Sequence, residues 1–234
     1  SDCNKYDRGH VLVIGGKMSG ASRIVALVSR KIGCGLSTIG VSKNYLKYYN
    51  GVEVGTIVQE ITKDLLKKKD VLVLGPGLGK NFDKKEIIFF LEVFKGPIVI
   101  DADAISIFKD ERKLFYQIIK KKKNIVLTPH KGEFNRLFNE SEESKLQNCI
   151  KASRLINNSI VYKGNDTVVC FKGENLWINH NATERLATAG TGDILCGLIS
   201  GLIAQKMNFR KAILAGVYIL GELSQIKKNF IAED

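Results

Sequence analysis

The stretch Val11-Leu12-Val13-Ile14-Gly15-Gly16 sets the pattern on which the fold of this chain is built. Its four consecutive apolar residues are typical of a strand that is buried on both faces of a sheet. Two glycines follow, and the amphipathic segment Ala21–Ile32 then predicts a helix. A buried strand that leads through a glycine turn into a helix is the repeating unit of a parallel sheet covered by helices.

The same alternation continues along the chain. Further strands are predicted at Ser37–Val41, Val71–Leu74, Ile98–Ile100 and Ile125–Leu127. Further helices are predicted near Gln59–Lys69 and over Lys84–Phe94, Ile105–Lys120 and Lys145–Ile156. The pattern then changes to short strands with glycine-containing turns, which favour an antiparallel meander, at Ile160–Tyr162, Thr167–Phe171 and Leu176–Ile178.

Helices that begin near Asp193 and Phe209 complete the chain. We therefore expect an α/β fold with a mostly parallel central sheet and antiparallel edge strands in the C-terminal half. No repeat, low-complexity tract or linker interrupts the pattern, which predicts a single domain over residues 1–234.

The composition excludes several classes of protein. Of the 234 residues, 44% are hydrophobic and 26% are charged, as in an ordinary globular protein. The longest apolar runs, Ile194–Ala204 and Ala212–Leu220, are too short to span a bilayer, so no membrane partner is expected. Five scattered cysteines without a C-x-x-C pair predict reduced thiols, which indicates a cytoplasmic location.

The net charge of +12 arises partly from lysine runs at residues 67–69 and 120–123, where two predicted helices end. Cations at such positions suit the helix dipole and are usually solvated. Basic residues interleaved with aromatic ones, or a known binding module, would indicate nucleic-acid binding. The sequence contains neither, so we expect no nucleic-acid partner. A basic field would still attract a phosphate-bearing small molecule.

A second glycine-rich stretch, Leu186-Ala187-Thr188-Ala189-Gly190-Thr191-Gly192-Asp193, precedes an apolar run long enough for a helix. The N–H groups and the positive dipole end of that helix would form an anion site over Gly190–Gly192. Asp193 has two interpretations there. It is either a base beside the hydroxyl group that accepts a phosphoryl group, or an aspartate that only stabilises the helix N-terminus.

Other polar clusters follow successive predicted strands, where ligands bind to parallel sheets. Gly15–Ser22 has the glycine spacing of a P-loop, but Ala21 stands where the phosphate-binding lysine is required, which excludes a Walker ATPase. Gly75–Gly79 lacks the G-x-G-x-x-G spacing of a Rossmann fingerprint. The remaining clusters are Asp101-Ala102-Asp103-Ala104 and Thr128-Pro129-His130-Lys131-Gly132-Glu133-Phe134.

Together, the motifs GPGLG, DADA, TPHKGEF, KGNDT and LATAGTGD, in this order, resemble the ADP- or ATP-dependent NAD(P)H-hydrate dehydratases, a branch of the ribokinase-like superfamily. The resemblance covers Gly9 to Asp234 and implies a three-layer α/β/α fold. It implies that ADP or ATP phosphorylates the C6 hydroxyl of (S)-NAD(P)H hydrate, and that elimination of phosphate returns NADH or NADPH. Mg²⁺ is the metal cofactor that this chemistry implies, with ligands that the sequence does not identify.

The resemblance also assigns residues. It implies that Asp193 is the catalytic base and contacts the substrate, together with Ala21, Gly77, Gly79 and His130. Nucleotide binding is assigned to two segments, whose residues are Lys163, Gly164, Asn165, Asp166, Thr167, Ala189, Gly190, Thr191 and Gly192.

For several of these residues a structural interpretation stays open. Lys163 could be a surface lysine at a strand end, and His130 could cap a helix. Asp101 and Asp103 could position a hydrated Mg²⁺ ion, or one of them could hold its loop through backbone hydrogen bonds. Glu133 could support the metal or lie at a helix N-terminus.

The alternative function is a kinase of the same superfamily that phosphorylates a small heterocyclic alcohol, because the GTGD motif is shared. The resemblance also leaves room for an N-terminal epimerase domain in a longer parent protein. The C-terminal helices are apolar on more than one face, which favours a homo-oligomer, with a tetramer as one candidate.

Overall fold

The computed structural model describes residues 7–51 and 53–226. Its strands are β1 (His10–Gly15), β2 (Leu36–Val41), β3 (Thr56–Glu60), β4 (Val71–Leu74), β5 (Ile98–Ile100), β6 (Ile125–Leu127), β7 (Ser159–Tyr162), β8 (Thr167–Phe171) and β9 (Asn175–Asn179). Within the described residues they form one sheet in the order β3-β2-β1-β4-β5-β6-β7-β8-β9. Strands β1 to β7 are parallel, whereas β8 runs antiparallel to both β7 and β9.

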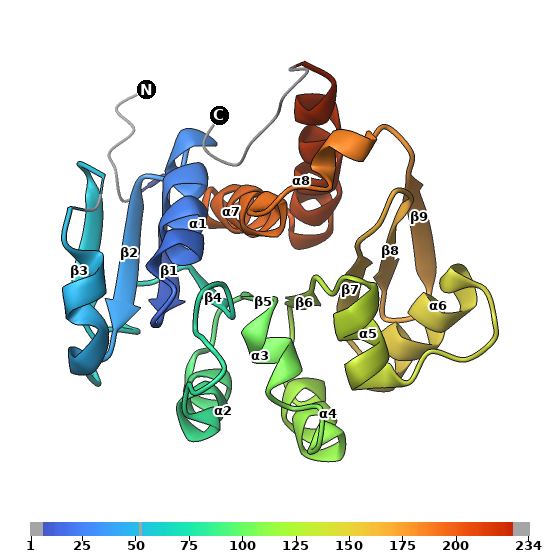
Figure 1. Ribbon diagram of the computed structural model, residues 1–234, viewed down its shortest axis with the longest axis horizontal. Coiled ribbons are helices and arrows are strands. Elements are labelled where there is room, and N and C mark those ends of the chain that lie inside the picture. Colours follow the sequence, from blue (N-terminus) through green and yellow to red (C-terminus); the bar gives the residue numbers. More distant parts are fainter. Residues whose placement is uncertain (1–6, 52, 227–234) are drawn as a thin grey trace.

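Helices cover both faces of the sheet (Figure 1). One face carries α1 (Ser19–Lys31), α7 (Thr191–Ala204) and α8 (Phe209–Ile226). The other face carries α2 (Lys84–Val93), α3 (Asp103–Ser106), α4 (Arg112–Lys120), α5 (Lys131–Phe138) and α6 (Lys145–Ile156). The expected α/β fold with antiparallel strands at its C-terminal edge is therefore confirmed, with its three layers.

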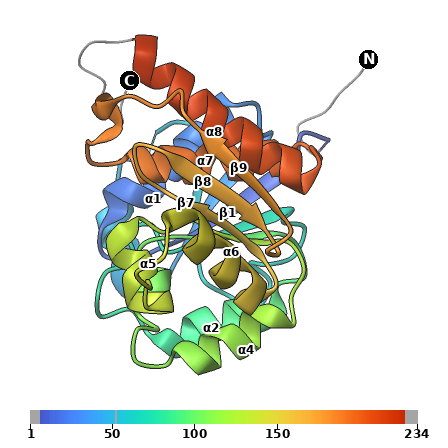
Figure 2. The ribbon, with the colours of Figure 1, turned by 90° about the vertical axis from the view of Figure 1, so that its right-hand side faces the viewer.

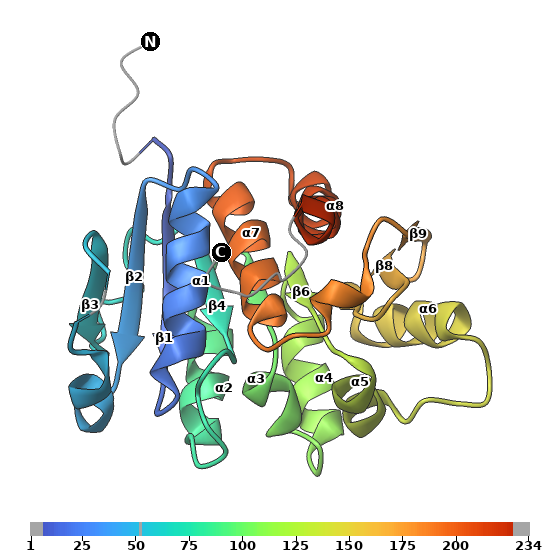
Figure 3. The same ribbon diagram turned by 45° about the horizontal axis from the view of Figure 1, so that its top comes forward.

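The central strands show why their sequences are continuously apolar. Leu12 and Ile14 of β1 pack into the core beneath α2 to α6, while Val11 and Val13 pack into the core beneath α1 and α7. All four side chains are fully buried, because side chains alternate between the two faces and helices cover both. Figure 3 shows α1 and α7 side by side over this part of the sheet.

Two secondary-structure predictions were wrong. Residues 56–60 form β3, and turns follow up to residue 68, where a helix near Gln59–Lys69 was expected. β3 is an edge strand with mostly polar, exposed residues, so its period-two pattern is weak. The lysines at 67–69 consequently do not lie at a helix end. The helix expected over Ile105–Lys120 is divided into α3 and α4, with turns between them.

Other elements agree closely with the prediction. The strands β5, β6 and β8 and the helix α6 have the expected bounds, and β7, β8 and β9 form the expected meander. Figure 2 shows this edge, with α8 packed along β8 and β9. Helix α5 was anticipated only as a helix that His130 could cap, without bounds, and the short 3-10 helices at Lys43–Tyr49 and Glu184–Leu186 were not predicted. None of the helices in the described residues is long and apolar enough to cross a membrane.

Candidate active site

The predicted site residues follow strands that are neighbours in the sheet. β1, β4, β5, β6 and β7 are adjacent and parallel, so their carboxyl ends lie at one edge. The turn after each strand carries one of the polar or glycine-rich clusters. Helix α7 begins at the same edge, with Gly192 beside the tips of β5 and β7. The topology thus gathers segments that are far apart in the sequence.

Two glycine-containing loops at this edge pair through their backbones. Lys17 N donates to Leu78 O (3.3 Å) and Met18 N donates to Gly77 O (3.0 Å). Gly77 has a φ of +75°, and a Cβ atom there would lie 2.2 Å from Met18 O and 3.3 Å from Ala21 Cβ. Only glycine suits this close approach. Ala21, Gly77 and Gly79, three of the predicted substrate-binding residues, therefore lie in one paired structure.

A buried ion pair joins the tips of β5 and β7. Lys163 Nζ lies 2.8 Å from Asp101 Oδ1, and the Asp101 side chain is only 3% exposed. Cys196 of α7 donates to Asp101 Oδ2 (3.6 Å). Burial alone would lower the pKa of Lys163, but the carboxylates of Asp101 and Glu133 raise it above its ordinary value. Lys163, whose side chain is 19% exposed, is therefore a largely buried cation held by Asp101, and the surface interpretation of this lysine is wrong.

The N-terminus of α7 carries a carboxylate of a different kind. Gly190 caps the helix with a φ of +88°, and Thr191 Oγ1 donates to Leu186 O and to Thr188 O (3.0 Å each). The side chain of Asp193 forms no hydrogen bond or ion pair with the residues that the structure describes. Burial and the charge of Asp101 raise its pKa to about 7, although Lys163 acts in the opposite direction. Such a carboxylate is able to accept a proton near neutral pH.

His130 caps helix α5, as its structural interpretation predicted. Its Nδ1 accepts a hydrogen bond from Gly132 N (2.9 Å), while Glu133 Oε2 accepts one from His130 N (2.9 Å). Because Nδ1 accepts this hydrogen bond, the neutral imidazole carries its proton on Nε2, which lies 3.3 Å from Glu133 Oε1. Burial and the charge of Lys163 lower the pKa of His130. Burial and the charge of Asp101 raise the pKa of Glu133 to about 7.

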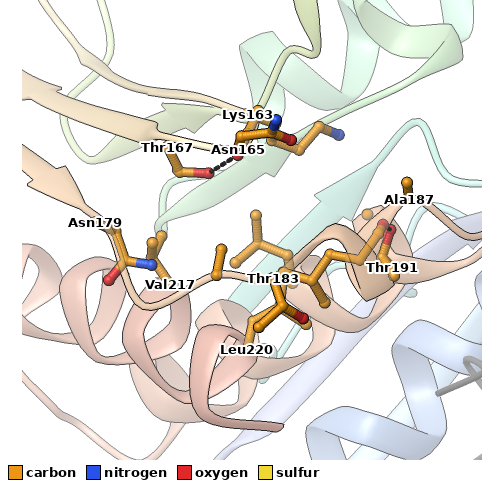
Figure 4. Close-up of a pocket in the computed structure, with 14 residues that line it drawn as sticks. Lys163, Asn165, Thr167, Asn179, Thr183, Ala187, Thr191, Val217 and Leu220 are labelled. Carbon is orange, nitrogen blue, oxygen red and sulfur yellow. Dashed lines mark hydrogen bonds between the residues drawn. The ribbon is translucent and has the colours of Figure 1, made fainter. Parts of the chain in front are cut away.

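A cavity of about 210 Å³ opens beside Asp193's helix, between the β7–β8 turn, α7 and α8 (Figure 4). Six of the residues predicted to bind nucleotide line it, namely Lys163, Gly164, Asn165, Thr167, Thr191 and Gly192. Asp166, Ala189 and Gly190 are not among its lining residues, and Asp166 instead pairs with Lys145 (3.3 Å).

The sequence prediction missed the apolar wall of this cavity. Val217 and Leu220 of α8 lie one helical turn apart and line it together with Leu195 of α7. Their helical spacing indicated only that this face of α8 is buried. Asn179, Ala182, Thr183, Leu186 and Ala187 complete the lining. The result is a cavity with polar residues on one side and an apolar wall on the other, which is typical of small-molecule sites.

The carboxylates at this edge do not form a ready-made metal cage. No group of three or more metal-ligating side chains occurs in the described part of the chain. Asp101 is held by Lys163, and Asp103 Oδ2 accepts a hydrogen bond from Gly79 N (2.8 Å), which matches the loop-holding interpretation. Mg²⁺ is usually held by one or two carboxylates together with substrate phosphates. The described residues offer Mg²⁺ no site made of three or more side chains, so the ion would be held mainly through the phosphates of a bound nucleotide.

Comparison with known proteins gives a consistent result. A family described as NAD(P)H-hydrate dehydratase matches residues 11–231. The ADP-dependent (S)-NAD(P)H-hydrate dehydratase of Neisseria meningitidis is 28% identical over 97% of this chain and 80% of its own length. The bifunctional NAD(P)H-hydrate repair enzyme of Coxiella burnetii is 31% identical over 93% of this chain. The chain spans about half the length of such bifunctional relatives, 46% in this case.

Solved structures agree. The Bacillus subtilis ADP/ATP-dependent NAD(P)H-hydrate dehydratase, co-crystallised with ATP and Mg²⁺, superimposes with a TM-score of 0.80 at 26% identity, over 97% of this chain and 83% of that one. A ribokinase-like superfamily protein of Enterococcus faecalis has a TM-score of 0.81 at 24% identity, over 99% of this chain and 85% of that one. The latter shows the fold alone.

Proposed function

The chain belongs to the NAD(P)H-hydrate dehydratase family, and we propose that it returns (S)-NAD(P)H hydrate to NADH or NADPH at the expense of ADP or ATP. The observation that carries the proposal is the position of Asp193. Its unpaired carboxylate, with a pKa near 7, lies at the N-terminus of α7 beside the cavity that the nucleotide-binding residues line. This is where a base beside a phosphoryl acceptor has to lie.

The proposed reaction has two steps. Asp193 takes the proton of the C6 hydroxyl as the oxygen attacks the terminal phosphoryl group, so that an O–P bond forms and the bond to the leaving nucleotide breaks. The C6–O bond then breaks and phosphate leaves with that electron pair, while the lone pair of the ring nitrogen forms a double bond to C6. Loss of a proton from C5 to water then places the double bond between C5 and C6 and returns the lone pair to the nitrogen. Phosphorylation is needed because hydroxide is a poor leaving group.

The remaining residues have supporting roles in this proposal. The N–H groups at the start of α7, from Thr191 and Gly192, would donate to the nucleotide phosphates. Lys163 adds positive charge at the same edge while it holds Asp101 in place. Mg²⁺, when bound, neutralises charge on the transferred phosphoryl group. The paired glycine loops with Ala21, Gly77 and Gly79 receive the hydrated nicotinamide.

The test is a single assay. Hydrated NADH is mixed with the protein and either ADP, ATP or no nucleotide, and the recovered absorbance of NADH is followed together with free phosphate. We expect both products to appear in equal amounts and only with nucleotide. A stable phosphoester without NADH would instead support the alternative, a kinase of a heterocyclic alcohol. No turnover with either nucleotide would contradict the proposal.

We also propose a homo-oligomer, in the cytoplasm. Trp177 and Ile178 of β9 are 39% and 50% exposed, and Tyr218 of α8 is 55% exposed. β9 is also an edge strand of the sheet, so a second copy would find exposed apolar side chains and a strand edge to pack against. The four cysteines within the described residues are free thiols, in keeping with a reducing compartment. Light scattering at micromolar concentration tests the assembly, and a clean 26.0 kDa species would contradict it.

A further inference from the structure

A second cavity, of about 510 Å³, lies on the opposite side of the sheet from the nucleotide cavity. Its walls come from the loop after β4, from the α3 region and from α5, and they include Gly79, Lys80, Asp103, Ser106, Lys109 and Arg136. Three of these side chains are cations and one is an anion. The anion is already engaged, because Asp103 Oδ2 accepts a hydrogen bond from Gly79 N (2.8 Å). The cavity therefore presents a net positive lining.

This cationic cavity borders the candidate active site. Gly79 belongs to the paired glycine loops, and Asp103 lies two residues beyond Asp101. On the other wall, Arg136 Nη2 lies 3.9 Å from the point where a Cβ atom on Gly132 would be, next to the cap formed by His130. Figure 1 shows α3 and α5 on the face opposite to α7 and α8. The two cavities therefore lie on opposite faces of the sheet, near the edge where α7 begins.

The cations of this cavity are free to bind an anion. In the part of the chain that the structure describes, neither Lys80 nor Arg136 forms an ion pair, and the polar contact of Arg136 is a long one to Ser106 Oγ (3.5 Å). Lys109 Nζ is 4.0 Å from Asp110, a side chain that is 82% exposed. Since an exposed pair of this kind contributes little, Lys109 can exchange it for a stronger partner.

We propose that the cationic cavity holds the diphosphate bridge of the dinucleotide substrate, with Arg136 and Lys109 as the main contacts. This rests on the proposed function. A hydrated nicotinamide with its hydroxyl at Asp193 has a ribose and then a diphosphate to place, and the nucleotide cavity on the α7 side is taken by the phosphoryl donor. The planar guanidinium group of arginine matches two phosphate oxygens at once. The volume is in the range of small-molecule sites.

The experiment measures binding without turnover. The dissociation constants of NADH, NADPH and reduced nicotinamide riboside, which has no phosphate, are determined by their fluorescence for the wild type and for Arg136→Ala and Lys109→Ala. We expect each substitution to raise the dissociation constants of NADH and NADPH about tenfold, because each removes a charge-assisted hydrogen bond. The factor should be the same for the two dinucleotides. Binding of the riboside should stay within about twofold. Arg136→Lys should recover part of the loss.

Lys113→Ala is the matched control, since it removes an exposed lysine of α4 outside the cavity. Arg136 is also exposed, so its substitution should leave the melting temperature unchanged. An unchanged NADH affinity, or a loss no larger than that of the control, would overturn the proposal. Weaker binding of NADPH alone would also overturn the proposal, because the cations would then bind the 2′-phosphate and not the diphosphate.

The proposed function fails separately from this inference. A wild-type protein that binds NADH through Arg136 but does not dehydrate NADH hydrate would contradict the reaction and leave the diphosphate site in place. If the wild type dehydrates both hydrates and Arg136→Ala has the same KM values for them, the reaction is supported and the diphosphate site is contradicted. In an active protein, the Arg136→Ala change should raise KM for the hydrate about tenfold and leave kcat and the KM for nucleotide within about twofold.

Discussion

The tip of β5 and the N-terminus of α7 each place a carboxylate at the same edge of the sheet. The first carboxylate is paired with other side chains, and the second is not. Asp101 is 2% exposed and paired with Lys163, and it also accepts a hydrogen bond from Cys196. Asp193 has no such partner, and its pKa is raised to about 7. The two charges are close enough for Asp101 to raise the pKa of Asp193. Asp101 is thus fixed by its contacts, and Asp193 is left able to take up a proton.

The difference separates structural from chemical roles within one cluster of charges. A buried ion pair adds little net stability when it forms but is costly to break, because a lone buried charge remains. A carboxylate with a raised pKa, in contrast, destabilises the folded protein at neutral pH and is expected where it serves a reaction. Each of the following substitutions alters one of these two carboxylates or its surroundings, beginning with the largest expected effect.

The largest effect is expected from Asp193→Asn. The amide has nearly the same shape but cannot act as a base, so kcat should fall by a factor of about 10²–10⁴. Nucleotide binding, measured as a ligand-dependent rise in melting temperature, should persist. Asp64→Asn serves as a control, because this aspartate is exposed and lies on a turn outside the site. A near-normal rate in Asp193→Asn would show that the base lies elsewhere.

The next largest effect is expected from Lys163→Met, which leaves Asp101 buried without its cation. Urea unfolding should show a loss of about 3–5 kcal/mol in the free energy of unfolding. The double variant Asp101→Asn/Lys163→Met should recover much of that loss, since no lone charge remains. Lys145→Met breaks the pair with the 65% exposed Asp166 and should cost less than about 1 kcal/mol. Equal losses in the free energy of unfolding for Lys163→Met and Lys145→Met would show that the Asp101–Lys163 pair is no costlier to break than an exposed pair.

The sequence predicted most of the sheet but not the division of roles at its edge. Continuous apolar runs such as Val11–Ile14 are unambiguous because both faces of the strand are covered, whereas the edge strand β3 has too few buried residues to show a period. Asp101, Lys163 and Asp193 all stood out in the sequence. The pairing of Asp101 with Lys163 could not be predicted, because it depends on the order of the strands in the sheet. That order brings the tips of β5 and β7, which are far apart in the sequence, to within reach of one ion pair.

The pH dependence should follow the raised pKa of Asp193. Because the base acts when ionised, kcat/KM should increase as the pH rises through about 7. Stability should change in the opposite direction. In the folded state the pKa of Asp193 lies above its ordinary value of 3.8, so its contribution to the free energy of unfolding is lost as the pH rises from about 4 through about 7.

The stability change is best measured as a difference between variants. Glu133 contributes in the same direction as Asp193, whereas His10, whose burial lowers its pKa to about 4, contributes in the opposite one. Urea unfolding of the wild type and Asp193→Asn at several pH values isolates the one group. The variant should gain stability relative to the wild type as the pH increases. A constant difference between the two would mean that the pKa of Asp193 is not raised.

The smallest effect is expected from Gly192→Ala, which tests how closely the two regions approach. The added Cβ atom would lie 3.1 Å from Lys163 Nζ and 3.3 Å from Asp101 Oδ2, so the lysine has to shift by a few tenths of an ångström. In the proposed complex the methyl group would also stand where nucleotide phosphates approach the N–H groups of α7, and an affinity about tenfold weaker is expected. Since ligand at 100 times its dissociation constant adds about 2.7 kcal/mol, the variant should lose about half of that stabilisation. Gly20→Ala on α1 is the control, because no atom lies within 4 Å of its added methyl group. If both variants keep the full nucleotide-dependent shift in melting temperature, the phosphates bind away from α7, and Asp193 loses its place beside them.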